Sequence, residues 1–98
     1  MSKAYEVAKA GGRHYGLIRR FAKEREAVIL KSIRSLQKMI QEHYDKINNP
    51  MKYIEQNVSV FHRQDLVSRY WPGEIENFEQ QIEVLKGILE DSKNERPS

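Results

Sequence analysis

The sequence contains no cysteine, and this absence excludes several kinds of chemistry at once. Disulfide bonds, thiolate metal sites and cysteine nucleophiles are all ruled out. No apolar run approaches the roughly 18 residues that a membrane span requires. The first ten residues also lack the apolar block of a signal peptide. We therefore expect a soluble cytoplasmic domain without a membrane span, and secretion would require delivery within a larger protein.

The chain is also short, with 98 residues, and this length limits what it can enclose. A chain of this size buries only roughly 60–65% of its unfolded surface, so its core is thin. One layer of helix packed on helix is the expected content of a single domain over 1–98. No large cofactor fits in such a core, and we expect no cofactor.

Glycine and proline are absent from the longest periodic segment of the sequence. Apolar residues recur at spacings of three and four from Leu17 to Ile47. This pattern predicts one continuous helix about 46 Å long. Asn48-Asn49-Pro50 is expected to end it, because proline disfavours a helical residue before it.

The second half of the sequence predicts shorter elements. Pro50 is expected to begin a short helix, residues 58–61 an extended connector, and residues 62–70 two helical turns. Trp71-Pro72-Gly73 is interpreted as a break before a last helix over Glu74–Asp91. Trp71 is expected to be buried, and the aromatic side chains before it are expected to pack.

These elements predict an all-α fold in which a long helix packs antiparallel on a shorter C-terminal helix, with short helices in the connector. Both long segments carry apolar seams with heptad spacing, which would also allow a homodimer. Residues 1–10 look weakly helical. Residues 1–12, with a hinge at Gly11-Gly12, are expected to form a flexible arm, and residues 93–98 a frayed tail.

Charge is distributed unevenly along the chain. Residues 1–50 carry eleven Lys and Arg against five Asp and Glu, a net charge of +6, whereas residues 51–98 carry six against nine, a net charge of −3. On a helical winding, seven cations of the first half share a sector of about 80°. They are Lys9, Arg13, Arg20, Lys23, Lys31, Arg34 and Lys38. This stripe is either a solvated helix face or a track for the phosphates of a nucleic acid.

His43 occupies a seam position where an apolar residue is expected, and His14 follows the two glycines. One interpretation is that His43 is a core histidine bonded to a carboxylate such as Asp65 or Glu79. The other is a general acid/base pair of His14 and His43, with Arg25 or Arg34 stabilising phosphorane charge. On one straight helix the two histidines would be about 43 Å apart. The three histidines are too widely spaced for a metal site, so none is expected.

Three stretches of the sequence resemble consecutive blocks of one longer motif. Gly11-Gly12-Arg13-His14-Tyr15-Gly16 resembles a Gly-Gly-(Lys/Arg)-His-x-Gly element. The block that follows it consists of Ser32-Ile33-Arg34-Ser35, Lys38, Ile40, His43, Lys46-Ile47, Asn49-Pro50 and Tyr53. The closing block consists of Trp71-Pro72, Ile75, Gln81 and Leu85-Lys86-Gly87-Ile88-Leu89. Together, over residues 8–89, these stretches resemble a C-terminal segment of bacterial polymorphic toxins, which are secreted proteins with exchangeable tails.

This resemblance implies an interbacterial toxin domain that acts in the cytoplasm of a target cell and is neutralised by a cognate immunity protein. It favours a metal-independent nuclease acting on RNA, with Arg13, His14, Arg34 and His43 at the motif positions. Lys9, Arg20, Lys23, Lys31 and Lys38 would then contact the nucleic acid. The alternatives are a non-catalytic helical module that binds nucleic acid, and a protein-interaction module such as an immunity or adaptor protein.

Overall fold

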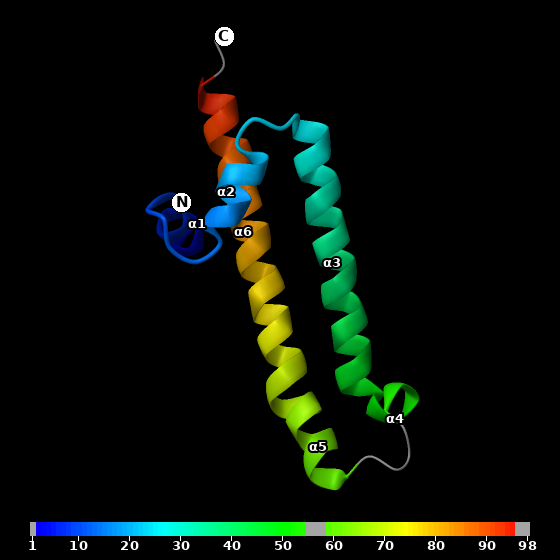
Figure 1. Cartoon of the computed structure of the whole chain (residues 1–98). Coiled ribbons are helices and arrows are strands. Elements are labelled where there is room, and N and C mark those ends of the chain that lie inside the picture. Colours follow the sequence, from blue (N-terminus) through cyan, green and yellow to red (C-terminus); the bar gives the residue numbers. More distant parts are fainter. Residues whose placement is uncertain (1, 55–58, 96–98) are drawn as a thin grey trace.

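The fold is known from a computed structural model, which describes residues 2–54 and 59–95 (Figure 1). It is all-α, and no strand occurs in these ranges. As predicted, the long helix α3 (Glu26–Asn48) packs antiparallel on the C-terminal helix α6 (Trp71–Glu95). α6, with 25 residues, is slightly longer than α3, with 23. The molecule is elongated and measures 58 × 25 × 19 Å.

The core lies along the seam between these two helices. α3 contributes Ile29, Ile33 and Ile40, and α6 contributes buried residues at spacings of three and four. Those residues of α6 are Ile75, Ile82, Leu85, Ile88 and Leu89. Because the seams pack on each other within one chain, a homodimer through the same residues would require the hairpin to open.

The first residues of the chain form a helix that packs on α6, whereas the sequence predicted a weakly helical, flexible arm. Helix α1 (Lys3–Lys9) begins at Ser2, whose hydroxyl accepts a hydrogen bond from the Tyr5 N–H. Tyr5 and Ala8 are buried against α6. The ring of Tyr5 lies directly over Gly87, where a Cβ would come within 2.2 Å of it.

The predicted continuous helix over Leu17–Ile47 is wrong, because the chain turns between α2 (Tyr15–Phe21) and α3. Arg25 is extended, with φ −67° and ψ 148°. On one straight helix Leu17 would point about 160° away from Ile33, so both could not face α6. The break lets each helix turn its apolar side to α6, and Phe21 becomes buried.

The predicted break at Trp71-Pro72-Gly73 is also wrong. Helix α5 (Val60–Asp65), the π-helical turn η1 (Leu66–Tyr70) and α6 follow one another without interruption. The Trp71 N–H donates to the Leu66 carbonyl, five residues back. This wider turn relieves the clash that a proline ring makes with the carbonyl four residues earlier, so the helix continues through Pro72.

The connector carries one more short helix. Asn49 ends α3, and Pro50 is the first residue of α4 (Pro50–Tyr53), as predicted. Part of the predicted connector over 58–61 lies outside the described residues, and Ser59 caps α5. Among the helices that the structure describes, none has the length and hydrophobicity needed to cross a membrane.

Candidate nucleic-acid interface

The glycine-rich loop between α1 and α2 has an unusual backbone. Gly11 has a φ of 94°, which favours glycine, and the Gly12 N–H donates to the Val7 carbonyl. His14 has a φ of 71°, a left-handed conformation that is uncommon for a residue with a side chain. Such conformations persist only where the surrounding structure imposes them, and they concentrate at functional sites.

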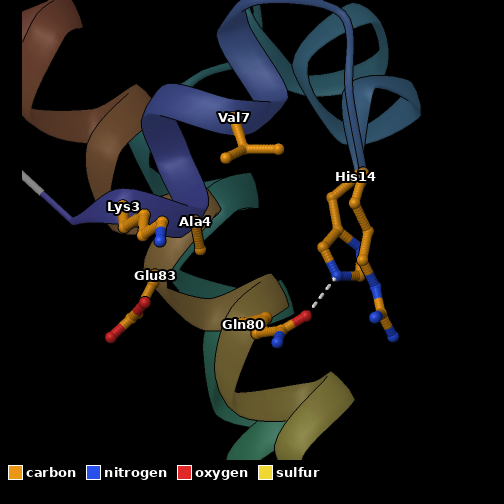
Figure 2. Close-up of a pocket in the computed structure, with 7 residues that line it drawn as sticks. Lys3, Ala4, Val7, His14, Gln80 and Glu83 are labelled. Atoms are coloured by element: carbon orange, nitrogen blue, oxygen red, sulfur yellow. Dashed lines mark hydrogen bonds between the residues drawn. The ribbon is translucent and has the colours of Figure 1, made fainter.

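The His14 side chain lies at the edge of a cavity of about 340 Å³ between α1, the glycine loop and α6 (Figure 2). Its Nε2 atom lies 3.1 Å from Oε1 of Gln80 on α6. Ala4 and Val7 of α1 supply apolar lining, while Lys3, Arg13 and Glu83 complete the polar part. Figure 2 shows the Glu83 carboxylate pointing away from His14.

His43 has a different environment, because it belongs to the core between α3 and α6. Only 7% of the residue is exposed. Its Nδ1 atom lies 2.8 Å from the Met39 carbonyl oxygen, and its Nε2 atom pairs with the Glu74 carboxylate. The ring packs edge-on against Phe78, with centroids 5.2 Å apart. These contacts match the core-histidine interpretation, with Glu74 in place of the expected Asp65 or Glu79.

The structure therefore brings Arg13 and His14 together but leaves His43 and Arg34 elsewhere. The α6 partners of the two histidines, Glu74 and Gln80, are six residues apart. This spacing corresponds to about 9 Å of rise and a rotation of about 240°. The two rings thus contact different faces of α6, and Arg34 is exposed on α3.

Four of the five predicted nucleic-acid-binding cations, together with Arg34, are exposed and free of ion pairs within the part of the chain that the structure describes. They are Arg20, Lys23, Lys31, Arg34 and Lys38. Lys9 differs, because its Nζ atom pairs with the Asp91 carboxylate at 3.2 Å. A group of unpaired cations is positioned to attract an anionic ligand.

Two of these cations face one groove between α2 and α3. Arg20 of α2 and Lys31 of α3 line this groove, which has a volume of about 290 Å³. Ser32 and Ser35 add hydroxyl groups to it, and the apolar lining comes from Leu17, Phe21, Leu36 and Leu85. On the predicted continuous helix, Arg20 and Lys31 would be about 16 Å apart along one face. The turn before α3 instead brings them to the same groove.

Two glutamines that the sequence did not predict as site residues also line these sites. Gln80 and Gln81 are consecutive on α6, and the first lines the glycine-loop cavity while the second lines the α2–α3 groove. Gln81 belongs to the closing block of the toxin-like motif but was given no role in a site, and nothing in the sequence distinguishes Gln80 from a solvent-facing glutamine. They are found only once α1 and α2 are placed on α6.

The far end of the hairpin is apolar and exposed. Phe61 is 82% exposed and Tyr70 56%, so the predicted packing of these side chains is wrong. Trp71, by contrast, is buried as expected. A groove of about 540 Å³ there is lined mainly by Pro50, Met51, Val60 and Val67 and is flanked by Arg63.

No cluster of three His, Asp or Glu side chains that could hold a metal ion occurs in the described ranges. Comparison with models of protein families, with curated proteins and with solved structures found no match. The functional inference therefore depends on the side chains and cavities of this chain itself.

Proposed function

We propose that this chain binds RNA and that the groove between α2 and α3 holds phosphate groups. The observation that supports this most directly is the convergence of Arg20 and Lys31, from two helices, on one groove with Ser32 and Ser35. A guanidinium group binds phosphate oxygens in pairs, an ammonium group adds a point charge, and hydroxyl groups donate hydrogen bonds. Among the described residues, neither Arg20 nor Lys31 forms an ion pair with a carboxylate.

The neighbouring cations extend this surface. Lys23 lies in the turn between the helices, and Arg34 and Lys38 continue along exposed positions of α3. From Lys31 to Lys38 the helix rises about 10 Å, which is long enough to meet more than one phosphate of a strand. We therefore expect RNA binding to weaken steeply as salt increases.

A double variant tests this proposal. Arg20→Ala/Lys31→Ala should lower RNA affinity about 10- to 100-fold at about 50 mM salt, because two phosphate contacts are lost. The slope of log affinity against log salt should become shallower by about 1.4 for a single strand. The measurement is fluorescence anisotropy of labelled RNA between about 50 and 200 mM salt.

Lys52→Ala/Arg69→Ala is the matched control. It removes the same net charge from the hairpin tip, where Lys52 pairs with Asp45 and Arg69 pairs with Asp65. This control should retain most of the affinity. Equal losses in the two double variants would mean that net charge alone attracts RNA, and the groove would then have no special role.

Ribonuclease activity of a toxin-type domain is a second candidate function, favoured by the left-handed backbone of His14 at a cavity that Arg13 also lines. In this reading His14 accepts the proton of a ribose 2′-hydroxyl, whose oxygen attacks the adjacent phosphorus to form a 2′,3′-cyclic phosphate. Arg13 stabilises the phosphorane charge, and the 5′-oxygen leaves with the proton that His14 returns. The His14–His43 pair is not part of it, because the two rings have separate partners. A cognate immunity protein would present acidic groups to the cationic surface.

Induced expression in a bacterium tests this second function. The wild-type chain should arrest growth and degrade cellular RNA, and His14→Ala should abolish both effects. His62→Ala is the control, because His62 is exposed on α5, away from the cavity. A wild-type chain that leaves growth and RNA intact at high expression would eliminate the nuclease, while the RNA-binding proposal would stand.

A further inference from the structure

The glycine-loop cavity and the α2–α3 groove are neighbours. Gln80 lines the first and Gln81 the second, and consecutive Cα atoms are only about 3.8 Å apart. Both also adjoin α2: Arg13 and His14 directly precede this helix, and Leu17 and Arg20 lie on it. A ligand that fills both cavities must therefore present a different chemical group to each of them.

We infer that the glycine-loop cavity takes an unstacked adenine base of single-stranded RNA, whose phosphates lie in the α2–α3 groove. The inference rests on the proposed RNA binding. The cavity of about 340 Å³ is within the usual range for small-ligand pockets. Ala4 and Val7 offer apolar contact to the faces of a base, and Arg13 adds a cation to the lining of the same cavity.

The polar edge of the cavity determines which base fits. With a hydrogen on Nε2, His14 donates to Oε1 of Gln80 and so fixes the orientation of the amide. The amide then still offers its two N–H donors and a second lone pair on Oε1. A donor and an acceptor side by side form the pair of hydrogen bonds by which glutamine recognises adenine at N6 and N7.

The partly buried position of the Gln80 amide, within the cavity, selects single strands. In an RNA duplex the bases are stacked and paired, and the major-groove edges lie in a deep, narrow groove that side chains do not reach. An unpaired base can be turned out and inserted, as in other sequence-specific RNA recognition. A duplex would contact only the cations of the groove and of α3.

The test compares three labelled RNAs of about 12 nucleotides or base pairs at about 50 mM salt: oligoadenylate, oligouridylate and a duplex. Wild type should bind oligoadenylate about tenfold more tightly than either of the others. Gln80→Ala should reduce oligoadenylate binding to the oligouridylate level and leave the duplex unchanged. Gln41→Ala, which removes an exposed glutamine of α3, is the matched control and should change none of the three.

Equal binding of all three RNAs by wild type, or an equal effect of Gln80→Ala on all three, would overturn the base pocket and leave phosphate binding in place. If wild type bound none of the three RNAs, the proposed function itself would be refuted. A titration with 5′-AMP, followed by the histidine ring signals in NMR, tests the cavity separately. Shifts of His14 without shifts of His62 support it, and an unmoved His14 signal refutes it.

Discussion

At the scale of single residues, His43 shows how a polar side chain is accommodated in a thin core. Its two ring nitrogens face acceptor groups, the Met39 carbonyl and the Glu74 carboxylate. Phe78 packs against the ring and limits access of water to it. The first bond is within α3 and the second reaches the first turns of α6, so His43 fixes one helix to the other.

His43→Ala should therefore destabilise the protein by about 2–4 kcal/mol, because it leaves a cavity in the core and removes the side-chain bond that links α3 to Glu74 of α6. Urea denaturation followed by circular dichroism measures this loss. His62→Ala, which changes an exposed histidine, should stay within about 0.5 kcal/mol of wild type. A His43→Ala variant as stable as wild type would contradict the structural role of this residue.

At the scale of elements, the docking of α1 depends on the absence of one side chain in α6. The Tyr5 ring occupies the space over Gly87, with its Cγ atom only 2.2 Å from the position of an added Cβ. Gly73 lies in the same helix but has nothing within 4 Å of such a position. The two glycines thus form a natural pair for separating steric conflict from helix propensity.

Gly87→Ala should destabilise the protein by about 1–3 kcal/mol, because the tyrosine must move or α1 must detach. Gly73→Ala should instead stabilise it by about 0.5–1 kcal/mol, since alanine favours the helix and the space is open. Both effects are read from thermal or urea unfolding. Stabilisation by both substitutions would show that α1 does not pack on α6 as described.

The elements also show which parts of the fold the sequence could predict. The seams of α3 and α6 were predictable, because the spacing of apolar residues indicates which side of a helix is buried. The turn before α3 was not, because residues 22–27 (AKEREA) are strong helix formers without glycine or proline, and only packing on α6 separates α2 from α3. At Pro72 the sequence predicted a break that the structure does not have, because a π turn accommodates a residue that usually ends a helix.

The same limit applies to the candidate site. The cations Arg20 and Lys31 were predictable from charge, but their meeting in one groove follows from the turn that the sequence does not signal. Gln80 had no distinguishing pattern at all. The groove and the position of Gln80 depend on contacts between segments that are distant in the chain. A local sequence pattern cannot predict such contacts.

At the scale of the whole molecule, the two ends of the chain are joined to each other. Asp91, near the end of α6, accepts a hydrogen bond from the Tyr5 hydroxyl and pairs with Lys9, both from α1. Lys93 pairs with Glu26 at the start of α3, at 3.4 Å. The opposite charges of the two halves thus meet at a few specific pairs. Among the described residues, the acidic side chains on the outer side of α6 (Glu76, Glu79, Glu83 and Glu90) form no ion pair.

This junction gives the stability a dependence on pH. The Tyr5 hydrogen bond, together with Lys9, holds the pKa of Asp91 below its usual value. A carboxylate with a lowered folded-state pKa contributes stability at neutral pH and loses that contribution as the pH falls through the folded-state value, below about 4. Asp91→Asn should therefore be less stable than wild type at pH 7, and the difference should shrink by pH 3.

Urea midpoints at the two pH values measure this effect, and the neighbouring Glu90→Gln, an exposed carboxylate, is the control. Glu90→Gln should keep the wild-type response to acid. An Asp91→Asn variant that loses as much stability in acid as wild type would mean that the junction of the two ends has no role in that response.

The contact between Tyr5 and Gly87 also constrains how this sequence can diverge. A ring at position 5 leaves no room for a side chain at position 87, so residue 87 cannot gain one while the tyrosine stays in place. We expect homologous chains to vary at these two positions in concert, with a small residue at 5 wherever a side chain appears at 87. Such paired substitutions would mark descent of the same N-terminal helix packing even where little else in the sequence is recognisable.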